Sequence, residues 1–271
     1  MIPSATLSGR GAVVTGGGRG IGAAIAAALA GAGANVIVAA RTGSEVEAVA
    51  SALRARGGKA WGVPCDVSDE AQVRTLAARA FQHAATVDSV DIDVLVNAAG
   101  DAGSAPFERL TLADWRVMLD AHATGTFLCT REFAPAMRER GFGRIVNVAS
   151  VAGLAGGRYI AHYAAAKHAV VGFTRSVALE LERSGVTIHA LCPGYVDTPM
   201  TQRTIDNVVA KTGRSPEAAL TSVLASADQE RLLTVAEVAA AALGLLGADG
   251  AATSGKAITL MPRGDACIWR S

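Results

Sequence analysis

The segment Ala12-Val13-Val14-Thr15-Gly16-Gly17-Gly18-Arg19-Gly20-Ile21-Gly22 decides the fold. It starts as a short apolar strand and ends in a glycine cluster, and helical composition follows over residues 21–32. Glycines between a strand and a helix allow positive φ and let the backbone approach a pyrophosphate at the helix N-terminus. The generic pattern fits only loosely, as Gly18-x-Gly20-x-x-Ala23, and an ordinary turn is the alternative. Its place between a first strand and a helix favours a dinucleotide-binding loop.

The rest of the chain alternates strands and helices. Apolar strands are predicted at residues 35–40, 60–65, 92–97, 144–149, 186–191 and 256–260. Helices are predicted at residues 45–56, 69–83, 112–140, 159–183 and 235–246, with 112–140 interrupted or ended near Pro135. Such alternation is typical of an α/β, doubly wound, Rossmann-like fold whose parallel sheet is covered on both faces. Since no linker or repeat divides the chain, we expect one dinucleotide-binding and catalytic domain over residues 1–271.

Residues 199–231 exceed an ordinary connection, and long connections are often functional lids. We therefore expect a small helical, substrate-binding lid here. The alternative is a peripheral pair of surface helices without a role. The segment carries cations at Arg203, Lys211 and Arg214, which could meet an anionic substrate group. It also carries Asp206, Glu217 and Asp228, so a mixed, solvated face is equally open.

Composition excludes several classes of partner. The 271 residues include 25 Lys and Arg against 24 Asp and Glu, a net charge of +1, which leaves no field to hold nucleic acid or an anionic membrane. At 51% hydrophobic the chain can bury a large core. The uncharged run Ala23–Ala40 contains two glycines and an asparagine, which favours helix, turn and strand over a membrane span. Four dispersed cysteines indicate neither a disulfide scaffold nor a metal site, and we expect a cytoplasmic protein without a metal.

The end of the second strand tests which dinucleotide is bound. Sites that prefer NAD place an acid there, whereas this chain has Arg41 and no carboxylate before Glu45. Arg41 can pair with a 2′-phosphate, and Arg19 can add a second contact. The alternative is that both are solvated surface charges. The charges favour NADP(H) over NAD(H).

Tyr163 and Lys167 lie four residues apart in a predicted helix and so share one face. A cation beside a phenol stabilises phenolate and lowers the phenol's pKa from about 10, which makes Tyr163 a usable acid or base. Ser150 follows the fifth strand, at the edge where a doubly wound fold gathers ligand contacts. A Tyr-x-x-x-Lys pair alone has low specificity, but the serine and the glycine loop raise it.

Over residues 7–260 the sequence resembles the short-chain dehydrogenases/reductases. The motifs that carry the resemblance are Thr15-Gly16-x-x-x-Gly20-x-Gly22, Asp66-Val67, Asn97-Ala98-Ala99-Gly100, Ser150, Tyr163-x-x-x-Lys167 and Pro193-Gly194-Tyr195-Val196-Asp197-Thr198. The resemblance implies a seven-stranded parallel sheet and a homotetramer built on long helices.

The resemblance also implies a role for particular residues. Ser150 would polarise a substrate carbonyl, Tyr163 would donate the proton, and Lys167 would hold the nicotinamide ribose. The expected cofactor-binding residues are Gly16, Arg19, Gly20, Ile21, Gly22, Arg41, Asp66 (adenine), Val67, Asn97 (steadying the turn after the fourth strand), Ala98, Gly100, Tyr163, Lys167, Pro193, Gly194, Val196 and Thr198 (the last two at the carboxamide).

Two positions depart from the family pattern. His122 stands where the family generally has an Asn that supports a water-linked proton relay. We expect His122 to be a fourth catalytic residue that titrates near pH 6.5 and adds a limb to the pH–rate profile. A buried neutral histidine that only packs, or a weakened relay, is the alternative. Residues 261–265 stand where the family commonly has an Asp-Gly-Gly turn, and residues 266–271 follow as a tail. The tail reshapes a subunit contact, approaches a neighbouring subunit's pocket, or is a plain surface end.

These observations predict an oxidoreductase that transfers a hydride between NADP(H) and a carbonyl or secondary alcohol, with Tyr163 as acid or base. Candidate substrates are a 3-oxoacyl thioester and a free ketone. One alternative is an NAD-dependent 3-hydroxyacyl-CoA or hydroxy acid dehydrogenase. Another class of protein, a non-catalytic cofactor sensor, is favoured only by His122 and opposed by the complete set of Ser150, Tyr163 and Lys167.

Overall fold

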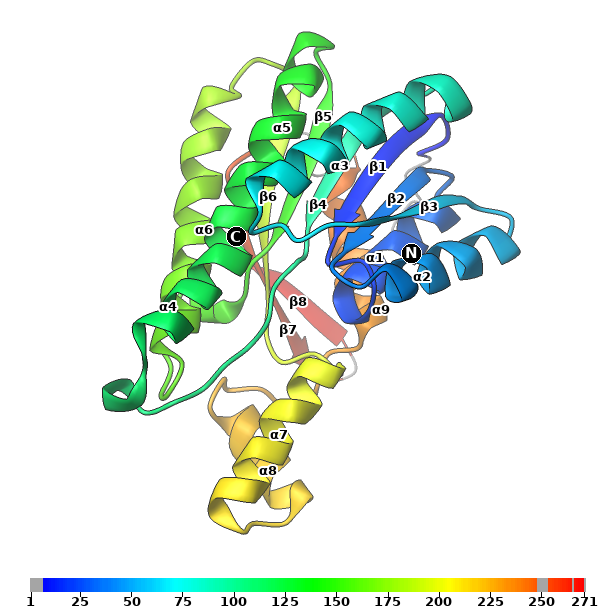
Figure 1. The fold of residues 1–271 in the computed structure, drawn as a ribbon. Coiled ribbons are helices and arrows are strands. Elements are labelled where there is room, and N and C mark those ends of the chain that lie inside the picture. The colour runs from blue at the N-terminus through cyan, green and yellow to red at the C-terminus, as the bar shows by residue number, and fades with distance from the viewer. Residues whose placement is uncertain (1–6, 248–252, 265, 271) are drawn as a thin grey trace.

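One eight-stranded sheet organises the molecule (Figure 1). The computed structural model describes residues 7–247, 253–264 and 266–270. The strand order is β3-β2-β1-β4-β5-β6-β7-β8. The strands are β1 (Arg10–Thr15), β2 (Asn35–Ala40), β3 (Lys59–Pro64), β4 (Asp91–Asn97), β5 (Gly143–Val148), β6 (Val186–Pro193), β7 (Ala257–Arg263) and β8 (Ala266–Arg270). The first seven pair in parallel, which confirms the predicted seven-stranded sheet, and β8 adds an antiparallel edge.

Helices cover both faces of this sheet (Figure 1). The main ones are α1 (Gly20–Gly31), α2 (Gly43–Ala55), α3 (Glu70–His83), α4 (Leu112–Leu119), α5 (Gly125–Glu139), α6 (Ala161–Glu180), α7 (Pro199–Thr212), α8 (Pro216–Ala225) and α9 (Val235–Leu246). Successive side chains of a strand point to opposite faces. Thus Val14 packs into a core with α1 and α9, and Val13 into a second core with α3 and α5. Because both faces are covered, the central strands β1 and β2 are apolar as predicted, whereas β3 at the edge of the sheet is mostly half-exposed.

The sheet reverses its winding beside β1. Strands β2 and β3 lie on one side of β1, and β4 to β7 lie on the other. In such sheets, ligands bind outside the carboxyl ends of the strands at this switch point. The segments that follow β1, β4, β5 and β6 are therefore the ones to inspect for a site.

The helical stretch after β4 is interrupted, but not at Pro135. A five-residue π-helical turn, Asp120–Thr124, separates α4 from α5, and α5 continues through Pro135 to Glu139. The prediction of an interruption near Pro135 is wrong. Pro135 is exposed, so the backbone carbonyl that loses its partner one turn earlier lies on the solvent side, where water can pair it.

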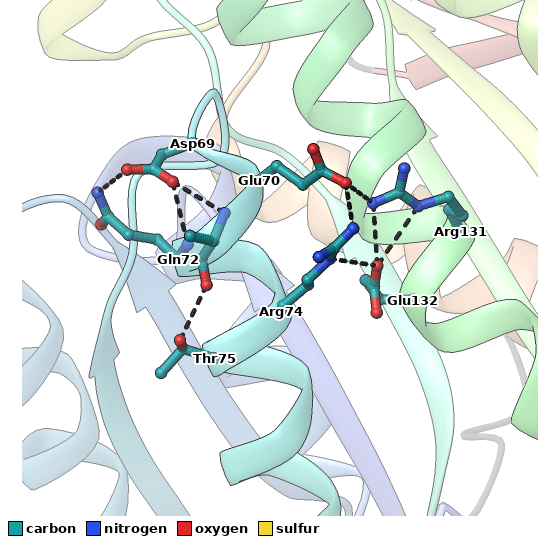
Figure 2. A network of polar contacts seen from close by, with 8 residues as sticks. Asp69, Glu70, Gln72, Arg74, Thr75, Arg131 and Glu132 are labelled. Atoms are coloured by element: carbon teal, nitrogen blue, oxygen red, sulfur yellow. Dashed lines mark hydrogen bonds and ion pairs between the residues drawn. The ribbon is translucent and has the colours of Figure 1, made fainter.

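An ion-pair network joins α3 to α5 on one face of the sheet. Figure 2 shows Arg131 and Arg74 between two carboxylates. Arg131 lies 2.8 Å from Glu70 and 3.1 Å from Glu132, and Arg74 lies 2.6 Å from Glu70. The four side chains are at least a quarter exposed, and ion pairs of this kind add little to folding stability. The network fixes the two helices relative to each other more than it stabilises the fold.

Residues 199–231, expected to form a small helical lid, contain α7 and α8, which project away from the sheet (Figure 1). Thr198 and Ser215 cap the two helices, each followed by a proline at the first helical position. Ile205, Ala219 and Val223 form a small apolar cluster of their own against the half-buried Tyr195. No helix in the described part of the chain is long and apolar enough to cross a bilayer.

Candidate active site

The loop after β1 has the geometry of a phosphate cradle. Gly16 has φ +64°, and a Cβ there would lie 2.6 Å from the Ala98 carbonyl oxygen. A Cβ on Gly22 would lie 2.2 Å from the Gly16 oxygen. Arg19 at the N-cap of α1 gives no side-chain cap, and no acidic residue stands in the first turn. The first N–H groups of α1, including those of Ile21 and Gly22, are therefore available to an anion.

The loop after β6 meets this cradle. A Cβ on Gly20 would lie 3.6 Å from Cγ2 of Thr198, so the glycine loop and residues 193–198 are in close proximity. Val196 is buried, and Thr198 caps α7 by accepting a hydrogen bond from the Thr201 N–H. The structure thus brings together two segments that lie far apart in the sequence and that the motifs assign to one cofactor.

Gln229 holds the β6 loop from behind, a contact that sequence reasoning missed. Its Oε1 accepts a hydrogen bond from the Tyr195 N–H at 2.7 Å, and its Nε2 donates to the Tyr195 carbonyl at 2.7 Å. A Cβ on Gly194 would lie 2.3 Å from Gln229 Oε1, which accounts for a glycine at that position. Gln229 matches no motif and lies 34 residues from Tyr195, so no sequence signal pointed to it.

The turn after β4 is fixed from two sides. Thr15 Oγ1 accepts hydrogen bonds from the N–H groups of Ala98, at 3.2 Å, and Ala99, at 3.3 Å. Asn97 is buried and donates to Thr130 Oγ1, at 3.2 Å, and to Asn147 Oδ1, at 2.8 Å. The Asn97 side chain is thus engaged inside the protein, and its role in steadying this turn stays a prediction.

Residues Asp66 and Val67 follow β3. Asp66 Oδ1 accepts hydrogen bonds from the backbone N–H and the hydroxyl of Ser68. The Val67 side chain is buried, and a Cβ on Gly125 would lie 2.6 Å from its Cγ2. Asp66 is thus held by its own turn at the sheet's carboxyl edge, whereas the Val67 side chain packs under α5.

Two arginines and one glutamate lie beside the phosphate cradle. Arg41 is exposed and enters no ion pair within the described ranges. The Arg19 guanidinium lies 3.7 Å from the Glu45 carboxylate, and Glu45 Oε2 would be 3.2 Å from a Cβ on Gly18. Two arginines against one glutamate leave one positive charge there. Glu45 lies close to the cradle although it falls four residues after the strand position where an acid was sought.

Ser150, Tyr163 and Lys167 form one cluster beyond β5. The Ser150 hydroxyl accepts a hydrogen bond from the Ala152 N–H at 3.1 Å and lies close enough to Tyr163 to lower the pKa of its phenol. Lys167 is 5% exposed, donates from Nζ to the Val148 carbonyl at 2.7 Å, and has Nζ 5.7 Å from the centre of the Tyr163 ring. The three side chains predicted to act together are together.

Burial has the largest effect on the pKa of Tyr163. Desolvation raises this pKa to about 12, although the nearby Ser150 side chain acts in the opposite direction. Desolvation also lowers the pKa of Lys167 to about 7. The prediction that the pKa of Tyr163 falls below about 10 is therefore not met, because the loss of hydration on burial outweighs the stabilisation of phenolate by a nearby cation. Tyr163 is a neutral phenol at pH 7, which is the form that can donate a proton.

His122 lies in the π-helical turn and is 2% exposed. Its Nε2 lies 2.7 Å from the Asp101 carbonyl oxygen, and its ring stands edge-on to Tyr163 with 5.5 Å between ring centres. Nδ1 is buried without a hydrogen-bond partner within the described ranges. A Cβ on Gly100 would overlap the imidazole, so a glycine is required for the ring to fit. Burial and the Lys167 charge lower the pKa of His122 to about 3.

The expectation that His122 titrates near pH 6.5 is therefore wrong, and we predict a different pH–rate profile. The limb in kcat/KM near neutrality belongs to Lys167, whose ammonium is present below pH 7 and lost as the pH rises through about 7. Because that cation stabilises phenolate developing on Tyr163, reduction slows above this pH. His122→Asn keeps the limb, whereas Lys167→Arg removes it because guanidinium stays charged. A limb that vanishes in His122→Asn contradicts this assignment.

Comparison with known proteins agrees with this geometry. Residues 10–208 match the family described as short chain dehydrogenase. A Streptomyces virginiae protein described as a ketoacyl reductase of the monensin polyketide synthase is 42% identical over 246 residues, 90% of this chain and 92% of that protein. A 3-oxoacyl-[acyl-carrier-protein] reductase of Synechocystis is 41% identical over 198 residues, 72% of this chain and 78% of the other.

A solved structure is similar over nearly the whole chain. A single-residue variant of the actinorhodin polyketide ketoreductase with NADPH superposes with a TM-score of 0.86 at 35% identity, covering 93% of this chain and 95% of that one. The fold and site define a nucleotide-binding oxidoreductase of the doubly wound class. The chain belongs to the short-chain dehydrogenase family.

Proposed function

We propose that this protein is an NADPH-dependent ketoreductase. The observation that carries the proposal is the cluster of Ser150, Tyr163 and Lys167 at the same sheet edge as the Gly16–Gly22 cradle. Relatives whose names state ketoacyl reduction, and a similar ketoreductase structure with NADPH, support the choice of reaction and cofactor. The direct test is a panel of ketones assayed with NADPH and NADH in parallel. Absence of turnover on the whole panel favours the cofactor-sensing alternative.

We assign the roles of Ser150, Tyr163 and Lys167 from their positions and from the protonation states of Tyr163 and Lys167. When bound, NADPH supplies the hydride that reduces the substrate carbonyl carbon. The Ser150 hydroxyl, which lies close to Tyr163, orients the carbonyl oxygen toward the phenol. Tyr163, neutral at pH 7, gives its proton to that oxygen, and the Lys167 ammonium stabilises the phenolate that forms. His122 is assigned the relay position as a neutral imidazole, through its hydrogen bond with the Asp101 carbonyl.

We also propose a role for residues 199–231, an oligomeric state and a cellular location. Residues 199–231 act as a substrate lid within a single domain, supported by their position directly after the β6 loop. A homotetramer built on the long helices is supported by large apolar side chains exposed along α4 to α6, at Trp115, Val117, Phe127 and Leu179. The cytoplasm is the proposed location, in keeping with three buried free cysteines.

We expect Arg41→Ala to lower kcat/KM for NADPH by roughly 10- to 100-fold and to leave NADH unaffected, because a charge-assisted hydrogen bond to the 2′-phosphate is lost. Glu45→Gln is expected to raise the ratio of kcat/KM for NADPH to kcat/KM for NADH, since the positive charge of Arg19 is then no longer compensated by a carboxylate. Steady-state kinetics with both cofactors measures the ratio. Arg56→Ala, an exposed arginine at the far end of α2, is the control and leaves it unchanged. Equal ratios in Arg41→Ala and wild type refute the assignment.

A further inference from the structure

An ion pair joins α7 to the loop that follows β4. The Arg203 guanidinium lies 2.7 Å from Asp101 Oδ1, across 102 residues of sequence. The two side chains are 46% and 40% exposed, so solvent and solutes reach both. Arg203 was considered above as a cation that could meet an anionic substrate. In the structure its charge is already compensated by a residue that no motif singled out.

The pair stands beside the catalytic cluster. The Asp101 carbonyl is the hydrogen-bond partner of His122 Nε2 at 2.7 Å, and the Asp101 N–H lies 3.3 Å from the same nitrogen. His122 in turn stands edge-on to Tyr163. Two direct contacts therefore connect the Asp101 backbone to the proton-donating ring, and Arg203 extends this chain to α7. The Asp101 and Arg203 side chains are therefore the charged groups of α7 and the β4 loop that this chain of contacts ties to the Tyr163 ring.

The other cations of this segment are too distant to replace Arg203. Lys211 lies eight residues further along α7, about 12 Å at 1.5 Å per residue, and Arg214 lies beyond the end of the helix. One positive and one negative charge in direct contact leave no net charge at the near end. A carboxylate or phosphate placed there meets an arginine that is already paired and an aspartate that repels it.

Resting on the ketoreductase function above, we propose that the Asp101–Arg203 pair selects ketones that are uncharged around the carbonyl. The pair offers hydrogen-bonding atoms on an electrically balanced surface, which a neutral ester, thioester or alkyl group tolerates. An anionic ketone has to displace Asp101 from Arg203 before it gains a cationic partner. Discrimination of this kind acts through a repulsive element against the wrong substrate.

Charge-neutral substitutions of the pair test the proposal. Asp101→Asn removes the negative charge and keeps an oxygen to accept the Ala102 N–H hydrogen bond, which is 2.9 Å long in the structure. The measurement is the ratio of kcat/KM for a 3-oxo acid to kcat/KM for its methyl ester, with NADPH. Asp101→Asn is expected to raise this ratio about tenfold, as one new charge-assisted hydrogen bond would do. Arg203→Gln is expected to lower it, since Asp101 then repels the acid unopposed.

Control variants distinguish an effect of the Asp101 and Arg203 charges from a general loss of structure or activity. Asp101→Asn/Arg203→Gln together is expected to return the ratio toward the wild-type value, because both charges are gone. Lys211→Gln, a cation on the same helix, leaves the ratio unchanged. All variants are expected to fold, since exposed ion pairs contribute little to stability, and thermal unfolding checks this. A wild-type ratio in Asp101→Asn overturns the proposal.

Failure of the ketoreductase function gives a different result. In that case neither the acid nor the ester turns over in any variant, and the ratio is measured instead from the Kd values of the two compounds by calorimetry. A shift of the Kd ratio toward the acid in Asp101→Asn supports the selection without the reaction. An unchanged Kd ratio overturns it.

Discussion

Tyr163→Phe is expected to reduce ketone turnover by about 10²- to 10⁴-fold, the contribution typical of a positioned general acid. The substitution removes the one hydroxyl that holds a transferable proton beside Ser150 and keeps the ring that packs against His122. NADPH affinity is expected to stay within a few-fold, because the cradle lies on another element. Turnover and NADPH binding, measured on the same preparation, give the two numbers.

Tyr159→Phe is the matched control for this substitution. It makes the same chemical change four residues earlier, at a side chain that is 59% exposed. We expect its turnover to remain close to that of the wild type. Equal losses in the two variants, or an active Tyr163→Phe, refute Tyr163 as the proton donor.

Gly16→Ala is expected to damage both the fold and cofactor binding. An alanine at φ +64° costs about 1–3 kcal/mol for the backbone conformation alone. Its Cβ would also lie 2.6 Å from backbone atoms of Ala98 and Ala99, which cannot move without disturbing the turn after β4. The displaced loop no longer aims its N–H groups at the pyrophosphate, so we expect NADPH affinity to fall by roughly tenfold or more. Chemical denaturation and equilibrium binding measure the two effects.

Gly31→Ala is the control for the losses of stability and NADPH affinity expected of Gly16→Ala. Gly31 ends α1, has ordinary helical φ, and a Cβ there would meet nothing within 4 Å. Alanine favours the helix over glycine by about 0.5–1 kcal/mol, so this variant is expected to be as stable as the wild type or slightly more so. Unchanged NADPH affinity in Gly16→Ala contradicts the phosphate-cradle assignment.

Much of the fold could be predicted from local pattern. The central parallel strands are buried on both faces and so carry short apolar runs, such as Ala12-Val13-Val14 in β1. The chain order of strands and helices then limits the topology to few solutions. The loops after β1, β4, β5 and β6 could be placed together because a doubly wound sheet gathers strand ends at one edge, whereas the roles of Tyr163 and Lys167, which lie on α6, came from their helical spacing and the family resemblance.

Contacts between segments that lie far apart in the chain could not be predicted from the sequence. Gln229 reaches Tyr195, and Arg203 reaches Asp101, only because the loops around the sheet edge converge in three dimensions. The ionisation of His122 was predicted wrongly for a related reason, since its pKa depends on complete burial beside Lys167. Strand β8 lies in a tail whose role the sequence left open. An interruption was predicted near Pro135, whereas the helical stretch is interrupted earlier, by the π-helical turn Asp120–Thr124.

The central claim is that this chain reduces a carbonyl by hydride transfer from NADPH with Tyr163 as proton donor. The most direct measurement uses NADPH carrying deuterium in the transferable C4 position, with a ketone identified from the panel. Mass spectrometry and NMR of the alcohol locate the label. One deuterium per molecule on the carbinol carbon, formed by the wild type and lost with turnover in Tyr163→Phe, is the predicted result. An alcohol without deuterium, or no alcohol from any ketone tested, contradicts the account.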